Sequence, residues 1–183
     1  MGNRLDAKNR VGYETGMTEA DSDREALLAL SSPPGFIVDP ELRFRDPLQS
    51  SMLDLWRARR TGGRLPARRD FDVLEMRDYL GWLSIAEVVE GGEDLVYRLV
   101  GTGVVDRMGR DITGRLASEI LPPTALRIFR HLIRHPAPLR GHGAAGWRDR
   151  DFLHHEMLLL PLADDGETVD RVFVLTTFEN AGK

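Results

Sequence analysis

Residues 82–100 read WLSIAEVVEGGEDLVYRLV, and this stretch decides the fold class. It holds two runs rich in β-branched and aromatic residues, 82–89 and 95–100. The segment between them, 90–94, is polar and contains two adjacent glycines. Two such runs joined by a short glycine-containing loop are typical of a β-hairpin, so an antiparallel sheet is predicted around this segment.

The chain beyond the hairpin alternates between helical and extended patterns. Short helical or irregular pieces punctuated by glycine are expected over 101–121, followed by an amphipathic helix over 124–135. Three further strands are predicted at 139–148, 152–162 and 171–178. Strands on both sides of a helical segment indicate an α+β fold with an antiparallel sheet and argue against a parallel βαβ array.

Two helices are predicted before the hairpin. Residues 47–60 carry a helical pattern, with Asp46 placed to cap the first turn. Residues 72–80 have capping-box spacing from Asp72, which predicts a shorter second helix. The apolar stripe of the first helix is available either for packing on the protein's own sheet or for a dimer interface, and it consists of Leu48, Met52, Leu55 and Trp56.

The patterns divide the chain into a tail and one domain. Residues 1–35 are polar, end in a Ser-Ser-Pro-Pro-Gly cluster and are predicted to be a flexible tail, although 23–30 could form two helical turns. The domain is expected over 36–183, with a helical lead-in at 47–81 and a core of sheet and helices at 82–178.

The composition excludes several functions. The 183 residues carry a net charge of −4 and contain no cysteine. The absence of cysteine excludes disulfides, thiolate metal sites, cysteine nucleophiles and a photosensor that forms a flavin adduct. The acidic balance argues against nucleic acid as a partner, and no apolar run is long enough to span a membrane, so we expect a cytoplasmic protein.

A series of short motifs runs through the domain. They are Trp56-Arg57, Leu65-Pro66, Asp70-Phe71-Asp72, the run Tyr97-Arg98-Leu99-Val100-Gly101-Thr102, the run Gly109-Arg110-Asp111-Ile112-Thr113-Gly114, and Glu156 with Leu160-Pro161-Leu162. Their order and spacing resemble the PAS sensor fold, and in particular a small stand-alone PAS-like family common in alphaproteobacteria. The resemblance covers roughly residues 36–180, which is most of the chain.

The resemblance implies a five-stranded antiparallel sheet with helices on one face and an N-terminal helical extension. It also implies a non-enzymatic sensory or regulatory module that binds a small ligand or a protein partner and signals through dimerisation or partner contact. The stripe of the first helix would then form the interface of a homodimer. A pocket between sheet and helices would be lined by Tyr97, Leu99, Met108, Ile112, Leu116, Phe129, Leu132 and Leu160.

Two alternatives remain open for the function. The first is a haem-binding gas or redox sensor, because some PAS oxygen sensors place their proximal histidine on the connecting helix. His135 is the candidate, since it lies nearer the apolar face of that helix than His131 does. The second is binding of a phosphate-bearing or nucleic-acid partner by the arginines of residues 57–69, whose charges nearby aspartates otherwise balance.

One further motif invites a nucleotide-binding interpretation. Gly101-Thr102-Gly103 follows a strand and precedes a helix, as in a dinucleotide-binding fingerprint. Asp106 stands where the third glycine of that fingerprint belongs, and no parallel βαβ unit follows. We therefore interpret the motif as a turn from strand into helix.

Overall fold

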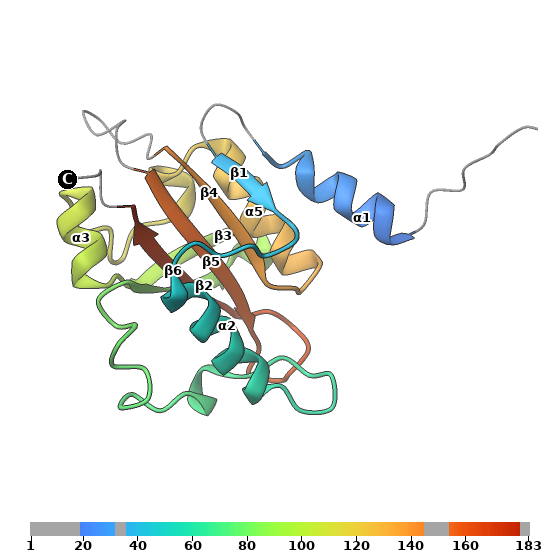
Figure 1. The fold of residues 1–183 in the computed structure, drawn as a ribbon, viewed down its shortest axis with the longest axis horizontal. Helices are drawn as coiled ribbons and strands as arrows, with labels where there is room; N and C mark the ends of the chain where they lie inside the picture. Colours follow the sequence, from blue (N-terminus) through green and yellow to red (C-terminus); the bar gives the residue numbers. More distant parts are fainter. Residues whose placement is uncertain (1–18, 32–35, 145–153, 180–183) are drawn as a thin grey trace, which may run out of the picture.

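The computed structural model describes residues 19–31, 36–144 and 154–179, and Figure 1 shows their arrangement. The strands are β1 (Phe36–Asp39), β2 (Leu83–Val89), β3 (Asp94–Leu99), β4 (Leu139–Ala144), β5 (His154–Leu162) and β6 (Arg171–Phe178). The α-helices are α1 (Glu19–Leu28), α2 (Pro47–Arg59), α3 (Thr102–Met108), α4 (Ala117–Ile120) and α5 (Pro123–Arg134). Two 3-10 helices, η1 (Arg68–Asp70) and η2 (Glu90–Gly92), lie in connections.

All six strands form one antiparallel sheet in the order β1-β4-β5-β6-β2-β3. The predicted hairpin is the β2–β3 pair at one edge of this sheet. The α+β fold class with a PAS-like antiparallel sheet is therefore confirmed. The sheet has one strand more than the five expected, because β1 pairs with β4 at the other edge, from Phe36 opposite Gly143 to Asp39 opposite Arg140.

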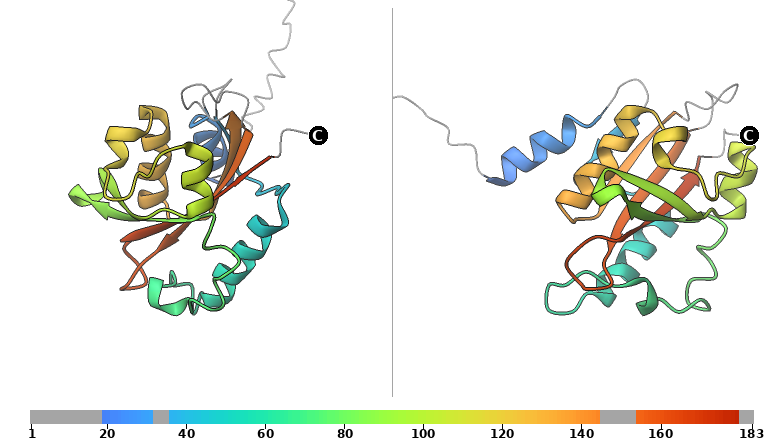
Figure 2. Two further views of the ribbon diagram at one scale, coloured as in Figure 1. Left: turned by 90° about the vertical axis from the view of Figure 1, so that its left-hand side faces the viewer. Right: turned by 180° about the vertical axis from the view of Figure 1, so that it is seen from behind.

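Helices cover both faces of the sheet. Figure 2 shows α4 and α5 on one side of the strands and α2 on the other. The helical extension that we predicted before the sheet therefore covers the face that the other helices leave open. Successive side chains of β5 point alternately towards the helices on one face of the sheet and towards α2 on the other, as expected for a strand. His155, Met157 and Leu159 line the space towards α3 and α5, while Glu156, Leu158 and Leu160 point towards α2.

Helix α2 forms where the sequence predicts it and packs on its own sheet. The Asp46 carboxylate accepts a hydrogen bond from the backbone N–H of Leu48 at 2.9 Å, which caps the helix as expected. Met52 and Trp56 are 0% and 1% exposed, and the indole N–H of Trp56 donates to the carbonyl of Pro161 at 2.9 Å. The side-chain amide of Gln49 donates to the carbonyls of Glu156 and Leu175.

This packing corrects the interface prediction. Met52 and Trp56 are fully enclosed by the protein's own core, so they have no surface to offer a second copy of the chain. Leu48 and Leu55 are half-buried against the same core. Of the two possibilities for this stripe, packing on the protein's own sheet is the one found.

The second predicted helix, over 72–80, does not form, and the segment consists of successive turns. The local capping interaction is present, because the Asp72 carboxylate accepts from the backbone N–H of Leu74 at 2.8 Å. The segment lacks a continuous apolar face, however, since Leu74 is 79% exposed while Met76 is buried. A short helix needs packing of such a face to be stable, and capping alone does not supply it.

The predicted tail contains one ordered element. Residues Glu19–Leu28 form α1, Arg24 makes an ion pair of 2.8 Å with Glu41, and Leu30 is buried against the core. The prediction of a flexible tail is therefore wrong for this stretch, where a helix longer than the expected two turns forms. Residues 1–18 and 32–35 lie outside the described residues.

Candidate functional site

A cavity of about 710 Å³ lies between the sheet and the layer of α3 and α5. Volumes of this size are typical of sites for small molecules, which are mostly apolar with a few placed polar groups. Every strand of the sheet contributes to its wall. The lining residues used below are Phe36, Ser84, Tyr97, Met108, Arg110, Ile112, Thr124, Ala125, Phe129, His155, Met157 and Thr176.

Three hydroxyl groups of buried residues line this mainly apolar space. They belong to Ser84 on β2, Tyr97 on β3 and Thr176 on β6, and each residue is buried. Within the described residues, none of the three side chains makes a hydrogen bond. Burial raises the pKa of the Tyr97 phenol, so the group is a neutral donor at any physiological pH. The three hydroxyls face the cavity and are available to a polar group of a molecule inside it.

His155 is the histidine of the cavity wall. Burial, together with the nearby His154 and His142, lowers its pKa to about 4, although a backbone hydrogen bond with Gly143 acts in the opposite direction. The imidazole is therefore neutral near pH 7. Its ring lies 5.7 Å from that of Phe36 in a stacked arrangement, which holds it in the wall.

Strand β1, the additional strand at the edge of the sheet, closes the cavity next to His155. Phe36 of β1 lines the cavity, and its ring lies directly over Gly141 of β4. A β-carbon at Gly141 would collide with that ring, so a glycine is required for the two strands to approach in this way. The glycine at position 141 of β4 thus has a structural cause.

The structure brings together half of the predicted pocket residues. Tyr97, Met108, Ile112 and Phe129 line the cavity. The other four candidates do not border it. Leu132 and Leu160 are completely buried core residues outside the cavity, Leu99 is 39% exposed, and Leu116 is half-buried in the connection before α4.

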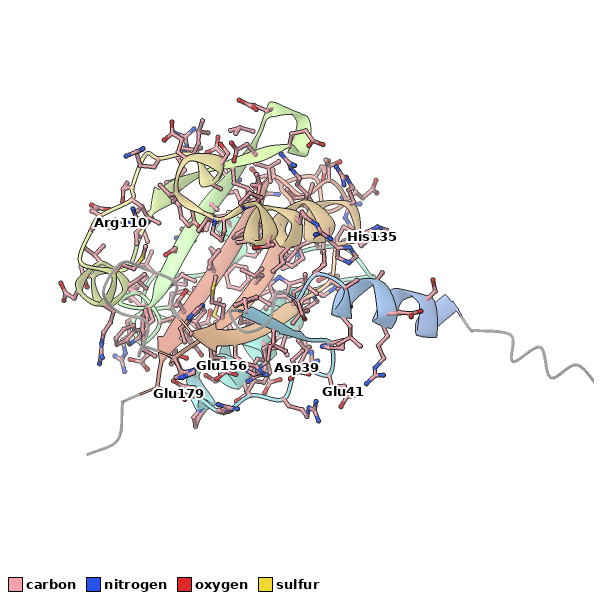
Figure 3. The ribbon with its side chains drawn as sticks, turned by 90° about the horizontal axis from the view of Figure 1, so that it is seen from above. Asp39, Glu41, Arg110, His135, Glu156 and Glu179 are labelled. Carbon is pink, nitrogen blue, oxygen red and sulfur yellow. The ribbon has the colours of Figure 1, made fainter. Side chains whose placement is uncertain are left out.

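His135 is not placed to hold a haem in this cavity. It lies at the C-terminal end of α5, is exposed, and has its ring 4.7 Å from that of His131. Figure 3 shows it at the opposite side of the molecule from Arg110, which lines the cavity. The helical-wheel argument had placed His135 beside the apolar face, but the helix ends at Arg134 and the chain turns away.

The residues that sequence reasoning missed are polar and lie on central strands. His155, Ser84 and Thr176 each lie on a buried strand, where successive side chains alternate between the two faces of the sheet. His154 and His155 lie on opposite faces of β5, since His154 is exposed and His155 is buried. The sequence pattern could not show which face carries the cavity, because both faces of the sheet are covered.

A buried ion network lies on the α2 side of the sheet. The Arg140 guanidinium donates to the carboxylate of Asp39 at 2.7 Å and to that of Glu156, and all three side chains are almost completely buried. Backbone N–H groups of Glu41 and Arg43 also bond Asp39. Burial acts to raise the pKa of Asp39, but these N–H groups and Arg140 outweigh it and hold that pKa below its usual value.

This network joins three strands that are distant in sequence. Asp39 is on β1, Arg140 on β4 and Glu156 on β5, and Figure 3 shows the two acids on the same side of the molecule. Glu156 also accepts from the backbone N–H groups of Arg45 and Asp46, where the chain enters α2. Its place in the motif quoted above therefore reflects a structural role.

The arginines of residues 57–69 are engaged within the chain. Carboxylates or backbone carbonyls accept from or pair with all six, and the partners are Asp54 for Arg57, Glu75 for Arg59, Gly63 for Arg60, Asp165 for Arg64, Phe71 for Arg68 and Asp164 for Arg69. The charges of this segment are thus matched by contacts within the chain.

The glycine motif before α3 is a turn, as interpreted. Gly101 is the N-cap residue of α3, and the N–H groups of Gly103 and Val104 donate to the carbonyl of Gly81 at 2.8 and 3.3 Å. The amide groups that a pyrophosphate would need are thus bonded to the chain itself.

The described residues contain no cluster of three or more histidine or acidic side chains that could hold a metal ion. In the same part of the chain, no helix has the length and apolar character needed to cross a membrane.

The described residues form an α+β domain in which an antiparallel sheet and its helices enclose a ligand-sized cavity. A family model described as PAS domain matches residues 45–176, and the chain therefore belongs to the PAS domain family. Domains of this family generally serve as sensory and regulatory modules. Among solved structures, the chain is similar to one described as "Structure of an RNA-binding Light-Oxygen-Voltage Receptor", with 14% sequence identity and a TM-score of 0.41.

That alignment covers 76% of this chain and 35% of the other, so the chain spans about a third of the length of that receptor. No curated protein matches the sequence.

Proposed function

We propose that this PAS domain is a non-enzymatic sensory module that binds a small, mainly apolar molecule in the cavity between the sheet and α5. The observation that carries the proposal is the combination of volume and lining. A space of about 710 Å³ is bordered by apolar side chains and by three buried hydroxyls that have no partner among the described residues. An apolar ligand with one or two polar groups would fill the space and bond those hydroxyls.

The output of the module would be a change in how the domain contacts a partner protein or a second copy of itself. The buried side chains of α2 do not contribute to such a contact, so it would use other surfaces. Native mass spectrometry of the chain, with and without a bound ligand, reports the number of chains in the assembly. A constant monomer in both states would leave partner contact as the only output.

The cavity is tested by filling it. The neutral apolar fluorophore N-phenyl-1-naphthylamine serves as probe, because its emission rises in an apolar site. Ala125 lines the cavity from α5, and Ala125→Phe places a ring in that space. We expect wild-type protein to bind the probe in the micromolar range and Ala125→Phe to lose at least tenfold in affinity, since the ring occupies the volume.

Ala58→Phe is the matched control, because Ala58 is exposed on α2 and lies outside the cavity. It adds the same ring and is expected to bind the probe like the wild type. Circular dichroism checks that both variants fold. Failure of the wild type to bind, or equal binding by folded Ala125→Phe, would contradict the proposal.

A further inference from the structure

The permanent charge of the described cavity lining is positive. The described residues that line the cavity include no aspartate or glutamate, and Arg110 is the one among them with a permanent charge. His155, the other titratable base in the wall, is neutral near pH 7 because burial holds its pKa at about 4. Among the described residues, a ligand inside therefore meets one permanently positive side chain and no carboxylate.

Arg110 differs from most other arginines of the described chain. Ion pairs to acidic side chains engage the majority of them, whereas Arg110 makes no ion pair or hydrogen bond within the described residues. The acid next to it in sequence, Asp111, bonds the backbone N–H and the hydroxyl of Thr113 instead. The guanidinium of Arg110 is thus available to an anion at the cavity.

The position of Arg110 is set by its surroundings. It follows Gly109, which ends α3 in the left-handed conformation with φ of 72°, and it is exposed while it lines the cavity. Figure 3 shows Arg110 at the periphery of the molecule, so it stands at the mouth of the cavity and not in its interior. The first turn of α5 also borders the cavity through Thr124 and Ala125. The N-terminal end of the helix dipole adds to the positive potential that Arg110 produces there.

We propose that the ligand is a monoanion, an apolar molecule whose single carboxylate pairs with Arg110 at the mouth while its apolar body fills the cavity. This inference rests on the proposed function, because it names the chemical class of the ligand of that site. One permanent positive charge matches one carboxylate. A phosphate monoester carries nearly two negative charges and would leave one without a counter-charge.

Decanoate and decanol separate the two parts of the proposal. The two have the same apolar chain and differ in the charge of the head group. Each is used below its aggregation concentration to displace N-phenyl-1-naphthylamine from the full chain. Arg110→Gln is expected to weaken displacement by decanoate roughly tenfold, since a hydrogen-bonded charge pair is lost, and to leave decanol unchanged. Arg110→Lys, which keeps the charge, is expected to retain most of the affinity for decanoate.

Arg127→Gln is the matched control. Arg127 lies on α5, is exposed, makes no ion pair within the described residues and does not line the cavity. Its replacement is expected to leave displacement of the probe by decanoate and by decanol unchanged. The inference is overturned if decanoate fails to displace a bound probe, or if Arg110→Gln affects both competitors equally or neither. If the wild type does not bind the probe at all, the proposed function itself fails.

Discussion

At the scale of single residues, the fold buries an ion network around Arg140 and a neutral histidine, His155. Arg140 lies between Asp39 and Glu156 with all three side chains almost completely buried. Such a network does little for net stability compared with apolar packing, but the loss of one member leaves the other charges without a partner in a medium of low polarity. The network therefore constrains which strands can meet.

Arg140→Met is expected to lower the free energy of unfolding by about 3–5 kcal/mol, because two buried carboxylates lose their counter-ion. Urea unfolding followed by circular dichroism measures the change. Arg115→Met is the control, since Arg115 pairs with Glu119 at the surface, and its loss is expected to cost below about 1 kcal/mol. Adding Glu156→Gln to Arg140→Met is expected to recover part of the loss. Equal effects of the two single changes would refute the role given to the network.

His155 makes the stability depend on pH in a defined window. Its pKa in the folded protein is about 4, below the ordinary value of 6.5, because it is buried in the cavity wall. As the pH falls below 6.5 the unfolded chain therefore binds a proton that the folded chain does not. The contribution to stability is complete above pH 6.5 and is lost progressively towards pH 4, amounting to about 3 kcal/mol.

Urea unfolding at intervals between pH 7 and pH 4.5 tests this dependence. His155→Gln is expected to show a much flatter dependence, with a residual slope from His142, whose pKa burial also lowers. His154→Gln, at the exposed neighbouring position, is expected to keep the slope of the wild type. A His155→Gln variant with an unchanged slope would show that this histidine is not the source.

At the scale of elements, the segment before the sheet is bonded to the helix that follows the hairpin. The carbonyl of Gly81 receives the first N–H groups of α3, and the backbones of Gly81 and Gly101 pass close together. A β-carbon at Gly101 would lie 2.5 Å from the Gly81 oxygen. This crossing fixes where α3 begins, and α3 carries Met108, a residue of the cavity wall.

Gly101→Ala is expected to destabilise the protein by about 1–3 kcal/mol, because backbone atoms must move to admit the methyl group. Gly81→Ala is the partner control, since a β-carbon at Gly81 meets nothing within 4 Å and its φ is not in the left-handed region. It is expected to be neutral or slightly stabilising. Thermal unfolding of both variants measures the difference, and equal melting temperatures would exclude a tight crossing at Gly101.

At the scale of the whole molecule, the sheet separates two environments. The α2 side is a filled core with the ion network at its edge, and the α5 side holds the cavity. Phe36 of β1 contributes to the cavity and Asp39 of the same strand to the network. Strand β1 thus belongs to the domain as fully as the strands that follow it, and a fragment that begins at the hairpin would lack part of the cavity wall and one member of the ion network.

Local sequence patterns specify the class of fold and most of its elements. Alternation and helical periodicity are local properties, so the hairpin, α2, α5 and the last strands were predicted close to their observed bounds. The motifs from Trp56 to Leu162 indicated the family correctly. The segment 72–80 failed because a helix of that length depends on packing that no local pattern reveals.

The tertiary structure alone decided which residues form the site. Leu132 and Phe129 have equivalent places in a helical pattern, yet one is buried in the core and the other borders the cavity. His155 and Arg110 both border the cavity, and the roles that we propose for them follow from the position of that cavity. A cavity is a volume that distant segments leave unfilled, and the sequence pattern of one segment does not contain it.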